Sequence, residues 1–352
     1  MFSKKQASEI LEHLSKAQNP IFYYDNDADG LCAFLLLRRF IGRGYGVAVR
    51  SYPELDESYL RKAEQLKADY IFVLDKPVIS KEFTDGVDRM QLPLVWIDHH
   101  DMIKGSKKEF LKNKNFYLYN PSLSGGKKKT NQPTSCLAYQ ITKREEDLWI
   151  ALVGCIADHY LPDFAGEFAK RYPEFWNKEI KKPFDVYYKS EIGRIALALN
   201  FGLKDSITNV VNMQNFLISC KSPNDVFLEL EINKSFREKF HEIKKKYDEL
   251  LKKAEESESH KIIYLIYSGD LSISSDLSNH LSYLYPDKCI VVAYKKGSIT
   301  NISMRGNNVK QVLEKVLKHL ENATGGGHRD AVGARIKTEE LAKFKELVEK
   351  EI

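Results

Sequence analysis

Short apolar runs alternate with amphipathic stretches through the first part of the chain. The runs are rich in β-branched and aromatic residues, which is typical of strands, and most of them are separated by stretches with helical periodicity. The expected strands span residues 21–24, 47–52, 70–74, 93–97 and 116–119. Because alternating strands and helices are typical of a parallel sheet covered on both faces, we expect an α/β fold with an N-terminal doubly wound, mainly parallel sheet.

Beyond residue 165 the pattern changes twice. Residues 166–258 are more polar, and apolar side chains such as Phe236, Phe240 and Ile243 recur at helical spacing, which predicts a helical connector. A smaller α/β unit follows, with strands expected at 262–267, 289–294 and 299–304 and helices at 277–285, 309–320 and from 338. We therefore expect a first domain over residues 1–165, a connector over 166–258 and a C-terminal domain over 259–352.

The first expected strand runs into three aspartates at alternate positions, Asp25, Asp27 and Asp29, followed by Gly30 and an apolar stretch that predicts a helix. Side chains two residues apart in an extended segment point the same way, so the three carboxylates can converge. A single aspartate here would be explained as a helix N-cap. Three converging carboxylates repel one another, and this favours a cation site.

Acids also follow two other expected strands and one helix. Asp75 comes directly after residues 70–74, and Asp98, His99 and His100 follow residues 93–97. Asp158 closes an apolar helical stretch, where a carboxylate needs a partner or a ligand. A lone aspartate after a strand is often a turn former. Carboxylates mixed with imidazoles at neighbouring strand ends instead favour a divalent metal.

A glycine run, Gly325-Gly326-Gly327, precedes His328 and Arg329 near the last expected helix. Successive glycines let backbone N–H groups converge into an anion-binding nest, and the two cationic side chains add donors. A flexible linker is the alternative meaning of a glycine run. The run passes straight into the apolar residues 331–334, which favours the anion nest.

Composition limits the remaining possibilities. The 352 residues include 54 basic and 49 acidic ones, so the net charge of +5 permits a polyanionic ligand without requiring one. Lysines cluster between Lys104 and Lys129, either as a solvated loop or as a local nucleic-acid contact. The five cysteines are widely spaced, which indicates neither a zinc site nor a disulfide framework. With no signal-peptide pattern and no apolar stretch of spanning length, we expect a cytoplasmic protein without membrane contact.

Taken in order, these motifs resemble the DHH phosphoesterase superfamily, and the resemblance covers nearly the whole chain. Its compact form resembles the archaeal RecJ-like exonucleases, with a DHH domain followed by a DHH-associated C-terminal domain. The resemblance implies a metal-dependent exonuclease that releases mononucleotides from single-stranded DNA or RNA, in replication or repair. It implies two Mn²⁺ ions, with Mg²⁺ or Co²⁺ as further possibilities.

The resemblance also implies roles for single residues. The expected metal ligands are Asp25, Asp27, Asp29, Asp75, His99 and Asp158. Among them, Asp75 would bridge the two ions, and Asp25 stands where some members place a histidine. Asp98 and His100 would act in catalysis, beside the ligands or against a phosphate. Substrate would be held by Arg305, Gly325, Gly326, Gly327 and His328.

Two other functions stay open at this point. A nanoRNase or linear-dinucleotide phosphodiesterase shares the same two-domain core, and some relatives have lost their ligands and serve as Cdc45-like replication scaffolds. Every matching acid and histidine is present here, which favours an enzyme. A replication or repair helicase complex is a possible partner, while the polarity of digestion and the oligomeric state are not determined by these motifs.

Overall fold

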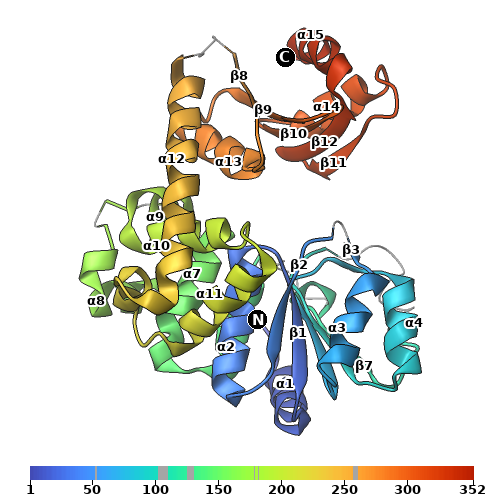
Figure 1. Ribbon diagram of the computed structural model, residues 1–352, viewed down its shortest axis with the longest axis vertical. Helices are drawn as coiled ribbons and strands as arrows, with labels where there is room; N and C mark the ends of the chain where they lie inside the picture. The colour runs from blue at the N-terminus through green and yellow to red at the C-terminus, as the bar shows by residue number, and fades with distance from the viewer. Residues whose placement is uncertain (52–53, 102–109, 125–130, 178, 181, 257–260) are drawn as a thin grey trace. The chain divides into compact units, whose positions relative to one another are not determined.

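The computed structural model describes residues 1–352 except 52–53, 102–109, 125–130, 178, 181 and 257–260. The chain forms two compact units, Met1–Phe240 and His241–Ile352 (Figure 1). The long helix α12 (Lys234–Glu256) contains the boundary between them. Each unit has its own sheet, so each is described by itself.

The first unit is built on a parallel sheet of five strands in the order β2-β1-β4-β6-β7. The strands are β1 (Pro20–Asp25), β2 (Tyr45–Val49), β4 (Tyr70–Leu74), β6 (Leu94–Ile97) and β7 (Phe116–Tyr119). Each of the five overlaps an expected strand, although β2 begins and ends earlier than expected, and the prediction of a mainly parallel doubly wound sheet is confirmed. Two short strands, β3 (Glu54–Leu55) and β5 (Val78–Ile79), pair beside this sheet.

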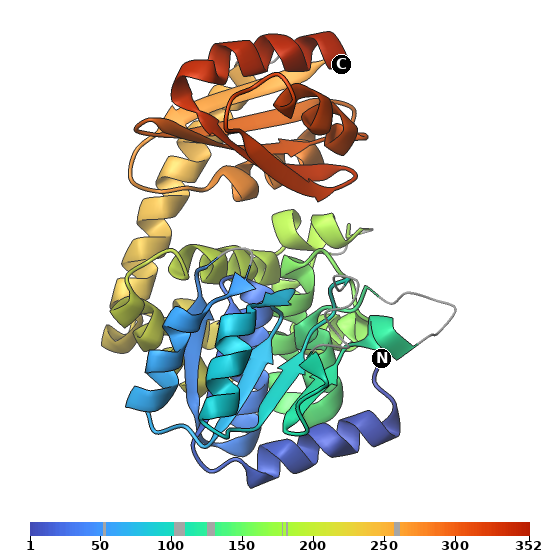
Figure 2. The same ribbon diagram turned by 90° about the vertical axis from the view of Figure 1, so that its right-hand side faces the viewer.

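Alternation along the central strands separates two cores. Phe22 and Tyr24 point to the side of α2, where both rings pack on Phe34, while Tyr23 packs on the other side against Phe83 of α4. Figure 1 shows α2 and α7 on one face of the sheet and α3 and α4 on the other, and Figure 2 views the sheet from the face that α3 and α4 cover. Because both faces are covered, the central strands are apolar throughout.

The helices of this unit begin before the sheet and continue well beyond it. Those that precede or interleave the strands are α1 (Lys4–Lys16), α2 (Ala28–Ile41), α3 (Leu60–Gln65) and α4 (Lys81–Arg89). Those that follow are α6 (Thr134–Thr142), α7 (Leu148–Ala157), α8 (Ala165–Arg171), α9 (Pro183–Lys189), α10 (Glu191–Gly202) and α11 (Ile207–Ser219). The region expected as a connector is thus helical, and most of it is part of the first compact unit.

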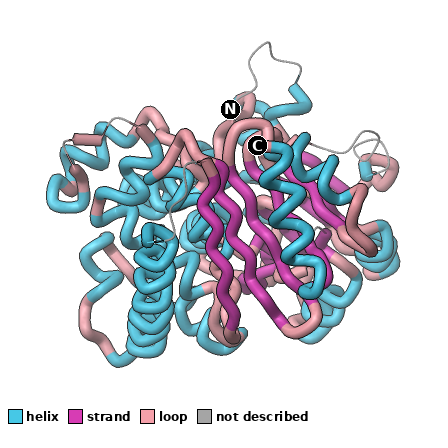
Figure 3. The backbone as a smooth tube through the Cα atoms, turned by 90° about the horizontal axis from the view of Figure 1, so that it is seen from above, coloured by secondary structure: helices cyan, strands magenta, loops and turns pink. Residues whose placement is uncertain are grey.

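The second unit holds a mixed sheet in the order β11-β12-β10-β9-β8. Figure 3 shows its strands in magenta, seen from above. Its strands are β8 (Ile262–Ser268), β9 (Cys289–Lys296), β10 (Ile299–Arg305), β11 (Thr324–His328) and β12 (Ala331–Lys337), and its helices after α12 are α13 (Ser274–Leu284), α14 (Val309–Leu317) and α15 (Leu341–Glu351). Only β8 and β9 are parallel. Strands β11 and β12 were not expected from the sequence, because glycine-rich segments lack the side chains that indicate a strand.

Candidate metal centre

The candidate centre lies at the carboxyl end of the parallel sheet, where ligands bind in this class of fold. Asp25 is the last residue of β1, Asp75 directly follows β4, and Asp98 directly follows β6. The three strands are neighbours in the sheet, so their ends meet at one edge. Asp158 reaches the same place from the end of α7.

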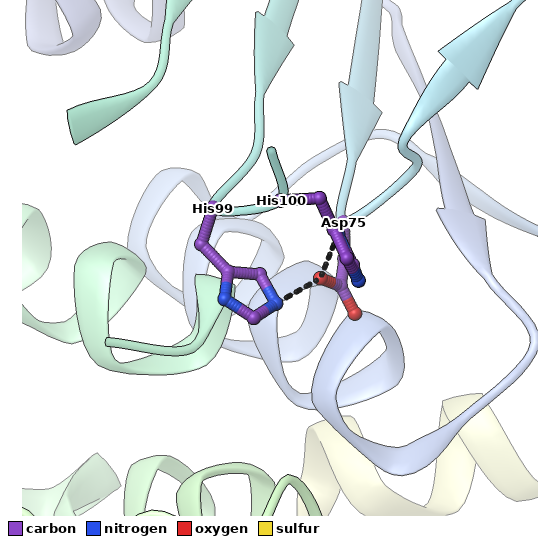
Figure 4. Close-up of side chains that lie close together, drawn as sticks. All are labelled: Asp75, His99 and His100. Atoms are coloured by element: carbon purple, nitrogen blue, oxygen red, sulfur yellow. Dashed lines mark ion pairs between the residues drawn. The ribbon is translucent and has the colours of Figure 1, made fainter. Parts of the chain in front are cut away.

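Asp75 is the hub of the cluster (Figure 4). Its Oδ1 lies 3.3 Å from His99 Nε2 and 3.9 Å from His100 Nδ1. Asp75, His99 and His100 each offer a ligand atom, and these atoms lie within 4.8 Å of one another. Asp158 adds a fourth group, since its Oδ2 is 3.8 Å from His99 Nε2. Four predicted site residues are therefore brought together by strand ends and one helix end.

The backbone at Asp75 is held in an unusual conformation. Its φ is +58°, in the left-handed region that non-glycine residues seldom adopt. The backbone N–H of Asp75 donates to Ile97 O at 3.0 Å, and the Thr134 hydroxyl donates to its carboxylate at 3.0 Å. Strain of this kind persists only where surrounding contacts fix it, and it is concentrated at functional sites.

Asp98 and Asn120 orient His100. Asp98 is fully buried, and its carboxylate accepts from His100 Nδ1 at 2.8 Å and from the His100 backbone N–H at 3.1 Å. Asn120 donates to Asp98 at 3.3 Å and to His100 O at 2.9 Å. The Asp98 contact holds Nδ1 and directs Nε2 of the same ring away from Asp98.

The first aspartate motif begins α2. Asp27 is the N-cap, and its Oδ1 accepts from the Gly30 N–H at 2.9 Å. The side chain of Asn200 accepts from the Ala28 N–H at 2.8 Å. A Cβ at Gly30 would lie 2.6 Å from Asp25 O, so glycine allows the helix to start against the strand end.

Asp29 is buried and holds the start of α6. Its two carboxylate oxygens accept from the backbone N–H groups of Thr134 at 2.8 Å and Ser135 at 3.0 Å, and it also accepts from the Ser135 hydroxyl. A carboxylate at a helix N-terminus satisfies otherwise unpaired donors. The structure thus connects Asp29 to α6 as well as to the acids around it.

Asp25 is paired with a lysine. Lys76 Nζ donates to Asp25 Oδ1 at 2.8 Å and to Ser51 O at 2.9 Å. The Lys76 side chain is 1% exposed, whereas that of Asp25 is 29% exposed. Lysine is seldom buried unless it is paired. This cation stands beside the very residues expected to bind metal.

The collected carboxylates raise one another's pKa values. Burial, with the charges of Asp29 and Asp27, raises the pKa of Asp75 well above its usual range. The same causes raise the pKa of Asp158 to about 8. Asp27 keeps exposed surface, yet desolvation by the surrounding protein and the charges of Asp25 and Asp29 raise its pKa to about 7. Negative charge is therefore unfavourable here unless a cation is bound.

The histidines respond in opposite directions. Burial lowers the pKa of His99. Burial also disfavours the charged form of His100, but its hydrogen bond to Asp98 and the nearby carboxylates outweigh that effect and raise its pKa to about 9. A neutral His99 is the form that can bind a metal ion.

The donor set fits a divalent ion of the Mn²⁺ or Mg²⁺ class. Carboxylate oxygens and imidazole nitrogen suit such ions, whereas thiolates, typical of structural zinc, are not among the donors named here. The raised pKa values of Asp75 and Asp158 add a physical reason, because burial and the charges of neighbouring acids both disfavour their ionised forms, and a bound cation would favour those forms.

The expected anion nest is wrong. Residues 324–328 form the extended strand β11, which pairs with β12 at the edge of the second sheet. Backbone N–H groups alternate in direction along a strand, so they do not converge on one anion as they do in a nest. The glycine run forms a strand because it pairs with β12, and the sequence pattern does not indicate this pairing.

The strand conformation instead creates an open face. Ala331 pairs with His328 on one side and with Arg305 on the other, so the three side chains share one face of the sheet. Gly326 and Gly333 are paired in the next row of that face. A Cβ at Gly326 would meet nothing within 4 Å, and one at Gly333 would meet only Ile302 O at 3.7 Å. The backbone here is bare and flanked by the side chains of Arg305 and His328.

Comparison with known proteins supports the fold. The model of the DHHA1 domain family matches residues 260–352. A sequence search of curated proteins finds no match. RecJ of Thermus thermophilus, solved with Mn²⁺, superposes with a TM-score of 0.67 at 15% identity over 98% of this chain and 54% of that chain. This chain thus spans about half the length of that RecJ, which has also been solved with Mg²⁺.

A second structure is similar over nearly its full length. The exonuclease RecJ bound to manganese has a TM-score of 0.64 at 15% identity, with 98% of this chain and 93% of that chain covered. The chain has the RecJ-like DHH fold. Cdc45 from Entamoeba histolytica shares this fold, with a TM-score of 0.56 at 13% identity over 98% of both chains.

Several residues of the candidate centre were missed by sequence reasoning. The position of Lys76 directly after Asp75 at a strand end could have indicated that it belongs to the centre. Lysine is not a metal ligand, however, so residue type alone does not point to it. Thr134 and Ser135 stand at a helix start, where such residues usually cap their own helix. Asn200 lies 172 positions from its partner Ala28, and no local pattern links them.

Other expectations concern the lysine cluster, the cysteines and membrane contact. Most of the lysines between Lys104 and Lys129 lie outside the described residues, although Lys112 and Lys114 are described and exposed. The five cysteines are free and buried, in line with the expectation of no disulfide framework. Within the part of the chain that the structure describes, each helix is too short or too polar to cross a membrane.

Proposed function

We propose that this protein is a metal-dependent exonuclease that hydrolyses terminal phosphodiester bonds of single-stranded DNA or RNA and releases mononucleotides. The observation that carries the proposal is the convergence of Asp75, His99, His100 and Asp158 at the carboxyl end of a RecJ-like sheet. Divalent ions occur in the solved RecJ structures with which the chain shares its fold.

Each part of the centre has a role in this proposal. A divalent ion held by Asp75, His99 and Asp158 would polarise a phosphoryl oxygen and lower the pKa of a bound water. Asp98 fixes the ring of His100, whose Nε2 would then contact a phosphate oxygen or transfer a proton. The second ion implied by the resemblance would be held by Asp27 and the bridging Asp75, with Asp25 as a further ligand, and Asp25 is bonded to Lys76.

The DHHA1 domain would supply substrate recognition. Arg305 and His328 lie on one face of its sheet, beside the paired glycines Gly326 and Gly333. Arg305 Nε donates to Asn279 Oδ1 at 2.7 Å, which fixes the plane of its guanidinium. Exposed backbone without side chains admits a close approach by a nucleotide, and flanking cations bind phosphate. The proposal therefore keeps substrate binding beside the glycines, but it does not include an anion-binding nest.

The test uses end-labelled single strands of DNA and of RNA, about 30 nucleotides long, with Mn²⁺. We expect progressive shortening to mononucleotides, loss of activity with chelator, and recovery when Mn²⁺ is restored. Affinity should fall as salt rises, because several phosphates release counterions. Labelling either end in turn reports the polarity of digestion.

The same assay separates the two other functions. Cleavage confined to oligomers of about two to five nucleotides, with little salt dependence, would replace the exonuclease by a nanoRNase. Metal binding without hydrolysis of any strand would favour a Cdc45-like scaffold. The retained acids and histidines favour hydrolysis, and the fold shared with Cdc45 supports a replication or repair context for the proposed enzyme.

A further inference from the structure

We propose that Lys76 is a built-in cation of the metal centre, and that this centre consequently takes one divalent ion instead of two. The ammonium group would neutralise the charge of Asp25, and the ion would bind to Asp75, His99 and Asp158. The inference rests on the proposed function only in requiring that these three residues bind an ion.

The contacts of Lys76 place its charge inside the protein. Its Nζ is 2.8 Å from Asp25 Oδ1 and 2.9 Å from Ser51 O, and the side chain is 1% exposed. Surface lysines extend into water and pair loosely, whereas this one is enclosed with two acceptors. A charge in such a position is retained because its partners hold it.

The backbone that carries Lys76 is fixed on both sides. The indole N–H of Trp96 donates to Lys76 O at 2.8 Å. Before it, the Asp75 N–H donates to Ile97 O, and after it β5 pairs with β3. The lysine therefore starts from a defined point one residue after the hub of the centre, and its side chain is directed to Asp25.

A second ion would compete with this ammonium for Asp25. Ions in two-metal sites lie about 3.5–4 Å apart and need carboxylates on both sides of the bridging group. An ion bound to Asp25 would lie a few ångströms from Lys76 Nζ, and like charges repel strongly where water is scarce. The short ion pair between Asp25 and Lys76 thus takes over part of the neutralisation that a second ion would provide.

The remaining acids of the first motif offer the second ion little help. Asp29 is buried and has both oxygens engaged by donors at the start of α6. Asp27 keeps exposed surface but uses Oδ1 to cap α2. On the opposite side, carboxylate oxygens of Asp75 and Asp158 lie 3.3 and 3.8 Å from His99 Nε2. The described contacts of these three residues include no ion pair with lysine or arginine. One ion on that side is the arrangement that these contacts favour.

The proposal makes Lys76 a positioning residue. It acts through Asp25, and its described contacts are with protein groups. Its removal should therefore change how many ions bind, which a purely structural role would not do.

The experiment counts metal in the full chain. Protein stripped with chelator is titrated with Mn²⁺ by calorimetry, and bound metal is measured by elemental analysis. We expect one Mn²⁺ per chain in the parent protein and, in Lys76→Ala, a rise to two ions. Electron paramagnetic resonance adds an independent signature, because two close Mn²⁺ ions give a spin-coupled spectrum and a single ion does not.

Two further variants serve as controls. Asp25→Asn should keep the parent count, because Asp25 is not a ligand in this proposal, whereas a two-ion site would lose an ion. Arg39→Ala breaks another buried ion pair, with Asp147, near the opposite end of α2 from the aspartate motif. It should lower stability and leave the metal count unchanged.

The outcomes are distinct. Two ions in the parent protein, or one ion in folded Lys76→Ala, would overturn the role of the lysine while leaving the proposed exonuclease intact. No bound ion in the parent would overturn the proposed function itself. If Lys76→Ala does not fold, as judged by circular dichroism, the parent count and Asp25→Asn decide the question.

Discussion

The two sheets of this protein present opposite surfaces. At the strand ends of the first sheet, acids and histidines are crowded. Asp29, Asp75 and Asp98 are buried there, and hydrogen bonds from other elements hold them in place. At the β11 edge of the second sheet, exposed glycines leave the backbone bare. The contrast teaches that the candidate metal centre is built by enclosing groups that repel one another, whereas the face proposed for substrate is built by leaving side chains out.

The largest effect should come from Asp75, at the centre of the enclosed site. Asp75→Ala should lower kcat by about 10³-fold or more, since losing several kcal/mol of charge stabilisation costs a tenfold rate for each ~1.4 kcal/mol. The measurement is turnover of single-stranded substrate with Mn²⁺. Asp75→Asn is the matched control, because asparagine tolerates the positive φ that alanine does not.

If Asp75→Asn loses as much activity as Asp75→Ala, the carboxylate is the cause. If it retains activity near the parent level in a folded protein, Asp75 is not the hub of a metal centre.

A smaller loss of activity is expected when a residue that orients a site histidine is changed and the expected metal ligands are kept. Asp98→Asn should lower kcat by about 10- to 100-fold, as is typical when a partner that orients a site histidine is altered. The reason is that Asp98 holds His100 Nδ1 and disfavours rotation of the ring. Combining Asp98→Asn with His100→Ala should cost little more than His100→Ala alone. Additive losses would show that Asp98 acts separately from His100.

On the open face, the effect should appear in substrate capture. His328→Ala should raise KM by about tenfold, the equivalent of one charge-assisted contact of ~1.4 kcal/mol. Bound metal, measured by elemental analysis, should stay at the parent value, because His328 belongs to the DHHA1 domain. Loss of metal in this variant would contradict the division of labour between the two sheets.

The smallest effect should come from a single methyl group on the bare strand. Gly326→Ala should raise KM by about threefold while the melting temperature stays unchanged, since the added Cβ meets nothing within 4 Å. Gly166→Ala, in α8, adds a methyl to equally open space in the other unit and should leave KM unchanged. Equal KM values for both variants would mean that substrate does not approach the strand closely.

Much of the fold was predictable because its signals are local. Apolar runs identified every strand of the parallel sheet, and the chemistry of strand ends drew attention to Asp75, Asp98 and His99 before their positions were known. The convergence of these groups follows from a general property of parallel sheets. Strand β11 was missed because a strand of glycines is defined by its partner and not by its own side chains, and β12, which has a single glycine, was missed with it.

The contacts that hold the site residues in place were less predictable, because they join residues that lie far apart along the chain. Residue type alone does not say that Lys76 turns inward or that Asp29 reaches Thr134, 105 positions away. A lysine next to an aspartate is usually solvated, and only the enclosure of its side chain distinguishes this one. Sequence patterns thus named the acids, while the tertiary structure determined which of them already have partners.

The Asn200 contact has a consequence for the order of events during synthesis. Chains emerge from the ribosome with the N-terminus first, and all five strands of the parallel sheet precede residue 120. The aspartate loop after β1, however, is completed by Thr134 and Ser135 and finally by Asn200, which binds the Ala28 N–H. A nascent chain that has emerged only as far as β7 can pair its strands but lacks the residues that shape this loop. The candidate metal centre is therefore finished late in translation, after the strands of the parallel sheet have been made.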